Sequence, residues 1–463
     1  MRIIIERELM DNIKSMQFIV LFIFSIGLFS MNGFIFVPRI KTQVAIYYDN
    51  SQKSKPSTFW ANIHKKPSLL MFISEGGEKH FPDLYHLYPT GRFKDDSYKA
   101  SKYNYKMIDN PEMDWVFIIK VIFSLYVILL GYNSVCGEKE QGTLRQILSN
   151  PINRIKLLTA KYCSIIIIAF IPLLIGMIIS LLIVGFSIPD VFSKSTLTSL
   201  LMIVITAFFY MSFFAFLSLF ISSIVKYSSV SLIILLVAWL TFLIIPEMSY
   251  IISEKITNVP GEYQVTRSIN SIRNDNSALT ELTKRIEAGE LDTEDKVIEE
   301  GSIMLAEISK KLGNQYKMYE NSLRQRKKNA RLISSISPMA LLQFVFEATA
   351  GTGSKNLDNF LSDISSYSIL YSRFVMEKVG KLVEEPIFSM GWHVIFKDKG
   401  LRISTPKPEQ YEGDMSDFPA FQQSKQSFIR TLRDAMLNLS GLLLWNIVLA
   451  IGAFWAFLRA DVR

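Results

Sequence analysis

The sequence predicts a membrane protein of mainly α-helical fold, with six transmembrane helices, an N-terminal interfacial helix and a mixed α/β extracytoplasmic domain. Apolar residues make up 49% of the 463 residues, and the mean hydropathy is positive. Six runs of the chain carry no charge: 15–38, 121–137, 162–189, 195–225, 227–246 and 435–458. A helix needs roughly 20 apolar residues to cross the ~30 Å hydrocarbon core of a bilayer. The second run is shorter, but Lys120 extends it outward because its aliphatic stem can lie along apolar surface.

The first 16 residues are expected to form the interfacial helix. Ile5, Leu9, Ile13 and Met16 recur at helical spacing, which suits a helix lying in the plane of the membrane surface. The alternative is that this segment extends the first membrane helix into the cytoplasm. The full predicted order is interfacial helix 1–16, membrane helices 17–38, 115–136, 161–188, 197–225, 227–247 and 435–458, extracytoplasmic segments 39–114 and 248–434, cytoplasmic loop 137–160 and cytoplasmic tail 459–463.

Basic residues in the short loops predict the orientation. Cytoplasmic loops carry an excess of Lys and Arg close to the helix ends. Loop 138–161 contains five such residues, whereas the short loop 188–196 has Lys194 as its one basic residue. Lys226 and the C-terminal Arg459 and Arg463 add to the same side. The chain is therefore expected to be a multi-pass protein of a bacterial cytoplasmic (inner) membrane, with both termini in the cytoplasm and both long polar segments outside.

The two outer segments differ in pattern. After Pro38, the alternation of Val44, Ile46 and Tyr48 predicts a strand. Residues 265–335 contain no proline and show helical spacing, so two or three helices are expected, with a hairpin turn near 288–293. The basic run 324–331 is interpreted as a solvated helix face, the alternatives being an acidic partner or lipid headgroups. No nucleic-acid readout motif accompanies this run.

The end of the second outer segment predicts one more helix and a small sheet. Ser337 is a plausible N-cap with Pro338 at the first helical position, and the helix should stop at Gly351. It is expected either in the core of the outer domain or on the outer leaflet. Alternating apolar residues around 392–396 and 401–403 suggest strands, which could pair with strands of 39–114.

The sequence predicts no catalytic, cofactor-binding or metal site in this chain. It contains neither a nucleophile-elbow nor a metalloprotease motif, and no ATP-binding loop. His80 and His86 bracket Asp83, but this spacing is weak evidence for a metal site. We interpret both as ordinary surface histidines. The two cysteines, Cys136 and Cys163, flank the cytoplasmic loop, so a disulfide framework in the outer segments is excluded.

The loop between the second and third membrane helices carries the most informative motif. It reads Glu138-Lys-Glu-Gln-Gly-Thr-Leu144, followed by Leu148-Ser-Asn-Pro-Ile-Asn-Arg154. This stretch resembles the first cytoplasmic loop of ABC-2-type transporter permeases. The elements at 337–343, 350–352 and 417–419 and the C-terminal tail resemble a subset of these permeases with an enlarged extracytoplasmic domain.

The resemblance implies that this loop couples the chain to a separate ATPase. The residues that match the coupling motif are Glu138, Lys139, Glu140, Gly142, Thr143, Leu144, Ile147, Leu148, Pro151 and Arg154. Leu144, Ile147 and Leu148 are expected to form an apolar face that enters a groove on the ATPase, so Leu144→Asp should uncouple the two proteins without disturbing the fold. The resemblance further implies two ATPase subunits, which bind ATP and Mg, and a second permease chain, identical or related.

Three functions remain open. The first is a permease subunit that exports or extracts a lipid-like, peptide or other amphipathic substrate, because the membrane runs contain few polar residues. The second is a mechanotransmission subunit whose outer domain acts on an extracytoplasmic protein partner without passage of a solute. The third is a membrane scaffold or receptor without an ATPase, against which the coupling-loop motif argues. None of these readings involves nucleic acid.

Overall fold

The computed structural model describes residues 6, 8–10, 13–14, 16–53, 61–77, 82–87, 93–95, 113–149, 153–273, 275, 277–290, 294–379, 393–397, 400–404, 417–418, 420–424 and 428–459. Within this part of the chain the protein is mostly helical, and six helices are long and apolar enough to cross a membrane. The predicted fold class is confirmed. Of the expected interfacial helix, Glu8, Leu9 and Met10 are helical, whereas Ile5 lies outside the described residues.

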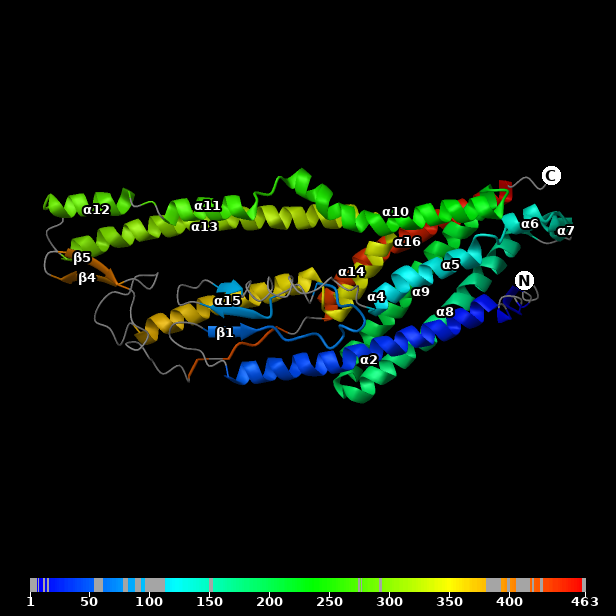
Figure 1. The fold of residues 1–463 in the computed structure, drawn as a ribbon, viewed down its shortest axis with the longest axis horizontal. Helices are drawn as coiled ribbons and strands as arrows, with labels where there is room; N and C mark the ends of the chain where they lie inside the picture. Colours follow the sequence, from blue (N-terminus) through cyan, green and yellow to red (C-terminus); the bar gives the residue numbers. More distant parts are fainter. Residues whose placement is uncertain are drawn as a thin grey trace.

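The six spans form one bundle in which most are single long helices. The first is α2 (Met16–Lys53), the third α8 (Arg154–Ser187), the fourth α9 (Lys194–Ile224), the fifth α10 (Ser228–Thr257) and the sixth α16 (Phe428–Arg459). The second span is built from α4 (Trp115–Phe117), the π-helical segment η2 (Ile118–Phe123) and α5 (Ser124–Gly131). Both chain ends lie at one end of the bundle, together with α6 (Cys136–Glu140) and α7 (Thr143–Ser149) (Figure 1). We call this the short-loop end, and the opposite end the domain end.

The polar residues of the first span are satisfied inside the bundle. The Asn32 amide donates to the backbone oxygens of Phe72 (3.0 Å) and Met113 (2.7 Å), and its oxygen accepts from Ser180 Oγ (2.8 Å). Ser180 Oγ in turn accepts from the indole N–H of Trp115 at 3.0 Å. Buried polar groups that are hydrogen-bonded in this way stabilise one packing arrangement. Asn32 therefore joins three spans and does not face an open passage in the single chain.

The first span is longer than expected. Helix α2 has 38 residues, a length of roughly 57 Å at 1.5 Å per residue, and continues 15 residues beyond Pro38. The predicted strand at Val44, Ile46 and Tyr48 is therefore wrong. Phe36, Ile40 and Val44 pack on the core at a spacing of four, so the helical period outweighs the short alternation. The extension carries α2 past the domain end (Figure 1).

A long helical hairpin projects from the domain end. Beyond α10 the chain forms α11 (Glu262–Arg273) and α12 (Ser277–Glu287), turns at Gly289 with a φ of +74°, and returns as the 41-residue helix α13 (Glu294–Ser334). Helix α13 lies beside α11 and the outer part of α10 (Figure 1). The predicted hairpin and its turn are confirmed. The interpretation of the basic run as a solvated face is wrong for Arg326, which stacks on Tyr250, and for Arg331, which lies over Phe344. It holds for Lys327, whose side chain stays exposed while it pairs with Asp358.

The chain then enters α14 (Pro338–Ala350), which begins and ends as predicted. Ser337 Oγ accepts from the N–H of Met339 and donates to the carbonyl of Phe242 in α10 at 2.6 Å. Gly351, with a φ of +77°, ends the helix. Helix α14 packs against α9 and α16, so it is wedged into the domain end of the bundle. It lies neither on the outer leaflet nor in a separate outer core.

The rest of the domain at this end of the bundle is a small α/β unit. Helix α15 (Ser354–Val379) shares an apolar core with the antiparallel strands β1 (Ala61–His64) and β2 (Leu84–Leu87), and β3 (Phe93–Asp95) pairs with β2. Phe360 of α15 contacts Tyr85 of β2 edge to face in this core. A second sheet consists of β4 (His393–Lys397) and β5 (Gly400–Ser404). The predicted strands at 392–396 and 401–403 are thus confirmed, but among the described residues they do not pair with the strands of the first outer segment.

Candidate functional site

The loop that carries the coupling motif folds into two short helices at the short-loop end. Helix α6 begins where the N–H groups of Val135 and Cys136 donate to Ser222 Oγ of α9, at 2.9 and 3.0 Å. Gly142 separates α6 from α7 and has a φ of +73°, a conformation that favours glycine. Thr143 Oγ1 donates back to the carbonyl of Glu138 at 3.3 Å. These contacts fix the loop on the fourth span.

Lys139 and Glu140 attach α6 to the turn between the fourth and fifth spans. The Lys139 ammonium donates to the carbonyl of Ser223, in the last turn of α9. Glu140 Oε2 accepts from the N–H of Ser228 (3.1 Å) and from its hydroxyl (2.8 Å) at the first residue of α10. A cation favours the C-terminus of a helix and an anion favours the N-terminus, because of the helix dipoles. Two successive residues of opposite charge therefore bind two helix ends of opposite polarity.

A buried ammonium group ties α6 to the third span and to the N-terminal segment. Lys161 of α8 is 3% exposed, and its Nζ lies 2.6 Å from Glu138 Oε1 and 3.1 Å from Glu8 Oε1. Burying an ion is unfavourable unless it is paired and hydrogen-bonded. The two carboxylates supply those partners, so Glu8, Glu138 and Lys161 hold three segments together.

Arg154 attaches the end of the loop to the last span. Its guanidinium donates to the carbonyl of Leu458 at 2.9 Å, close to the C-terminus of α16. Asn153 caps α8 by accepting from the N–H of Ile155 at 2.9 Å. Arg154 therefore satisfies a carbonyl that the helix itself leaves without a donor. Pro151 lies outside the described residues.

The apolar residues of α7 face this chain's own core. Leu144 is 2% exposed and belongs to the main core cluster, and Ile147 and Leu148 pack partly buried against it. The expectation that Leu144 enters a groove on a partner is therefore wrong, because the side chain is already covered in the single chain. The side chains that α6, α7 and the turn between them expose are polar instead: Glu140, Gln141, Arg145, Gln146 and Ser149.

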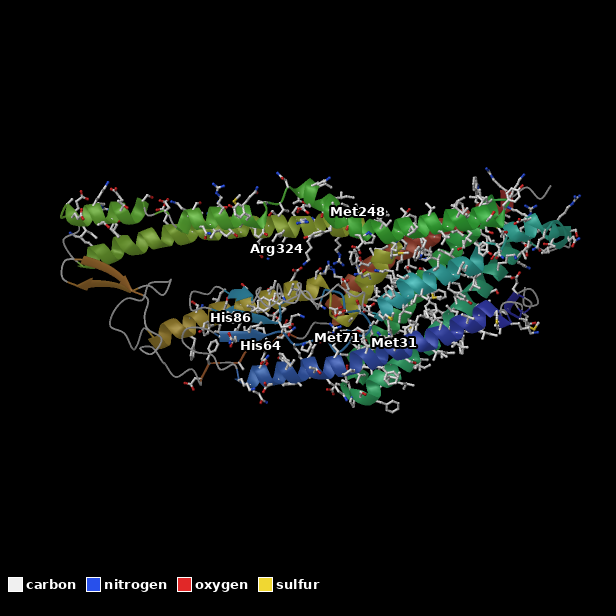
Figure 2. The ribbon with its side chains drawn as sticks, in the orientation of Figure 1. Met31, His64, Met71, His86, Met248 and Arg324 are labelled. Atoms are coloured by element: carbon white, nitrogen blue, oxygen red, sulfur yellow. The ribbon has the colours of Figure 1, made fainter. Side chains whose placement is uncertain are left out.

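The other candidate positions that the structure describes are histidines of the first sheet and the buried Cys136. His86 Nδ1 lies 2.7 Å from Asn62 Oδ1 across the first sheet, and His64 lies on the same sheet in the outer domain (Figure 2). His80 lies outside the described residues, and those that are described contain no group of three metal-ligating side chains. Cys136 is buried beside Ser222 at 3.3 Å.

The motif did not reveal the residues that receive these contacts. Glu8, Lys161, Ser222 and Ser228 are all part of the site and were not among the predicted site residues. Lys161 carried one signal, since a lysine at the start of a long apolar run is bound to need a partner if the run is buried. The serines had none, because serine is common near helix ends throughout the chain.

The comparison with protein families agrees with the motif. A family model described as ABC-2 family transporter protein matches residues 2–462. No curated protein matches the chain.

Proposed function

Because the chain belongs to the ABC-2 family of transporter proteins, we propose that its α6–α7 surface docks onto a separate ATPase and transmits ATP-driven movement to the spans. In this family the chain is the permease subunit of an ABC transporter. The single observation that supports the docking site best is the set of contacts of the loop: Glu138, Lys139 and Glu140 join α6 to the third, fourth and fifth spans. Arg154, where the loop enters the third span, binds the sixth.

These contacts explain how a push on the loop reaches the bundle. Each contact joins a charged side chain either to a helix end or to a buried ion, so the loop cannot shift without moving the helices or breaking several hydrogen bonds. Hydrogen bonds to charged groups contribute about 1.5–3 kcal/mol each to stability. Displacement of α6 together with the spans it contacts is therefore easier than displacement of α6 alone.

The docking surface on this chain is polar. Arg145, Gln146 and Ser149 are the exposed residues of α7, and Glu140 and Gln141 are exposed shortly before it in the chain. Charged and polar contacts of this kind contribute to specificity and association rate more than to affinity. We propose that this polar face, with Arg145 as its cation, contacts the ATPase, while Leu144, Ile147 and Leu148 support it from below.

We propose two copies of the permease in the working assembly, with two ATPase subunits that bind ATP and Mg. The fifth span supports a second copy, because α10 is the least buried of the six spans and exposes Ile233, Val237, Leu240 and Ile244 along one stretch. We also propose an orientation in which the short-loop end lies in the cytoplasm and the domain at the other end lies outside a bacterial cytoplasmic membrane.

An amphipathic substrate, such as a lipid or an apolar peptide, suits the spans best. Asn32, Thr206, Asn438 and Asn446 are buried, and the amides of Asn32 and Asn446 donate to backbone oxygens within the chain. They are therefore used for packing and do not form a polar stripe for a hydrophilic solute.

A mechanotransmission subunit is the second candidate. It is favoured by α10, which continues without interruption from the short-loop end to the base of the outer hairpin, and by the extension of α2 beyond the domain end. Rigid helices that cross the membrane boundary would carry a movement of the spans to the outer domain and to a protein partner there.

Purification of the tagged chain from its native host in a mild detergent tests the docking proposal. An ATPase at equal stoichiometry is expected, and Arg145→Glu should reduce its recovery severalfold. Lys41→Glu, the same charge reversal at an exposed position of α2, is the matched control and should leave recovery unchanged. Recovery of the chain without any ATPase would overturn the proposal and favour a scaffold or receptor.

A further inference from the structure

The second span contains a π-helical segment with a lysine at its centre. Lys120 lies in η2, and its carbonyl oxygen accepts from two hydroxyl groups, Ser124 Oγ at 2.6 Å and Tyr210 Oη of α9 at 2.8 Å. Ser124 Oγ also accepts from the indole N–H of Trp239 in α10 at 2.8 Å. Short π-helical segments inside α-helices are frequent at functional sites. The main chain at Lys120 is thus tied to the fourth and fifth spans.

The side chain of Lys120 points to a different helix. Its ammonium donates to Gln343 Oε1 of α14 at 3.2 Å, and Gln343 Nε2 donates to Glu347 Oε1 at 2.7 Å. Gln343 and Glu347 are four residues apart, so they lie on one face of α14. The head group of Lys120, which is expected to extend the second span outward along its stem, therefore has a protein partner.

Glu347 is the last of these polar groups and packs against the loop that follows β1. A Cβ at Gly76 would lie 3.1 Å from Glu347 Cγ, and a Cβ at Gly353 would lie 3.2 Å from Glu347 Cβ, so glycine at both positions allows the close approach. The loop itself is fixed to the second span, because the N–H groups of Trp115 and Val116 donate to the carbonyls of Phe72 and Ile73. One face of α14 therefore rests on a unit made of the second span and this loop.

Helix α14 is also the link between the two halves of the outer domain. The chain passes from α13 into α14 through residues 335–337 and from α14 into α15 through residues 351–353. Any shift of α14 along the second span must therefore move α13 and α15. The second span, in turn, continues through α5 into α6, the helix of the docking site.

We propose that Lys120, Gln343 and Glu347 form a polar latch that holds α14 on the second span and releases it when the docked ATPase moves that span. These three residues position α14 during transport and do not contact the substrate. The coupling of the latch to ATP rests on the proposed function, whereas the latch itself is a property of this chain alone. Polar contacts suit a latch because each hydrogen bond forms at one register and is lost on a small displacement.

The charge of Glu347 gives the latch a measurable signature. Desolvation raises the pKa of Glu347, opposed by the hydrogen bond from Gln343 and by Arg331 and Lys120, and Asp114 adds to the rise. Among the described residues, Arg39 and Glu75 of the loop form a further charged pair near this face, 2.6 Å apart. A raised pKa means that the latched state favours the neutral carboxyl. By linkage the latch is therefore strongest at acid pH and weakens as pH rises through the pKa of Glu347.

Spin labels at Thr42→Cys of α2 and Asn321→Cys of α13 test the latch in the full chain reconstituted in lipid nanodiscs, with Cys136 and Cys163 replaced by Ala. The distance distribution between the labels should broaden as pH rises from the ordinary carboxyl range through the raised pKa of Glu347. Glu347→Gln should keep it narrow at every pH. Gln343→Leu, and independently Lys120→Met, should broaden it at every pH.

Thr349→Val is the matched control, because Thr349 lies on the same helix and its hydroxyl donates only to the carbonyls of Val345 and Phe346. It should behave like the parent chain. Distributions that are the same in the parent, Gln343→Leu and Lys120→Met would overturn the latch. If the latch responds to pH but ATP has no effect with the co-purified ATPase present, the docking proposal fails and the latch stands.

Discussion

Lys139 and Glu140 are neighbours in the chain, yet they bind the ends of two different spans: the ammonium of Lys139 contacts the C-terminus of α9, and the carboxylate of Glu140 accepts from the N-terminus of α10. Two adjacent residues of α6 thus contact both sides of the turn 225–227 that joins those spans. Each charge meets a helix end of opposite partial charge. A helix held in this way moves together with both spans, which is the property a coupling element requires.

Removal of the Glu140 charge should loosen α6 from the fifth span. In Glu140→Gln the acceptor of the Ser228 N–H is weaker, so the midpoint of thermal unfolding and the ATP-driven transport rate are both expected to fall. Ser228→Ala removes the hydroxyl donor of the same contact. A double-mutant cycle followed by thermal unfolding should therefore show non-additive effects. Strictly additive effects would mean that the two groups do not interact.

Leu144→Asp should destabilise the fold and should not act as a selective uncoupling change. The side chain is 2% exposed in the main core, and a buried carboxylate without a partner costs about 3–5 kcal/mol. We expect low yield and a lower midpoint of thermal unfolding. The exposed neighbour Arg145→Glu should stay within about 0.5 kcal/mol of the parent in stability. A well-folded Leu144→Asp chain that fails to bind the ATPase would restore Leu144 as a docking residue.

Lys161→Met should release the N-terminal segment from α6. Loss of the ammonium removes the cation that Glu8 and Glu138 share. Breaking a fully buried pair costs about 3–5 kcal/mol, and the cost here is smaller because both carboxylates are partly exposed. Hydrogen exchange should rise at residues 8–10 and 136–140. Lys156→Met, at an exposed position of the same helix, should leave exchange at both segments unchanged. Equal protection in the two variants would contradict the role of Lys161.

Gly176→Ala should disturb the packing of the first and third spans. A Cβ at Gly176 would lie 2.3 Å from Cδ2 of Phe29, a ring that is fully buried, so one of the two helices must shift. Overpacking of this kind costs about 1–3 kcal/mol. Gly27→Ala is the matched control in the first span, because no atom lies within 4 Å of the added Cβ. The thermal midpoints of the purified variants distinguish the two, and a Gly176→Ala chain as stable as Gly27→Ala would contradict the packing.

Much of the site was predictable from the residues, but which of its faces packs on the chain itself was not. The motif placed Glu138, Lys139, Glu140 and Arg154 together on one loop, and the structure does use all four as contacts at the short-loop end. The helical spacing of Leu144, Ile147 and Leu148 also indicated one apolar face. Periodicity identifies a face that must be covered but does not say by what, so whether a partner or the chain's own bundle covers it could not be decided from the pattern.

By itself the sequence determined the spans, the outer helical hairpin with its turn at Gly289, and the limits of α14 from Ser337 to Gly351. These features depend on local patterns: apolar length, the absence of proline, and capping residues. Tertiary structure alone decided that α2 continues to Lys53, that Lys120 binds Gln343, that Lys161 holds Glu8 and Glu138, and that Leu144 is covered. Each of these depends on a partner far away in the chain, and local physical chemistry sets the need for such a partner without identifying it.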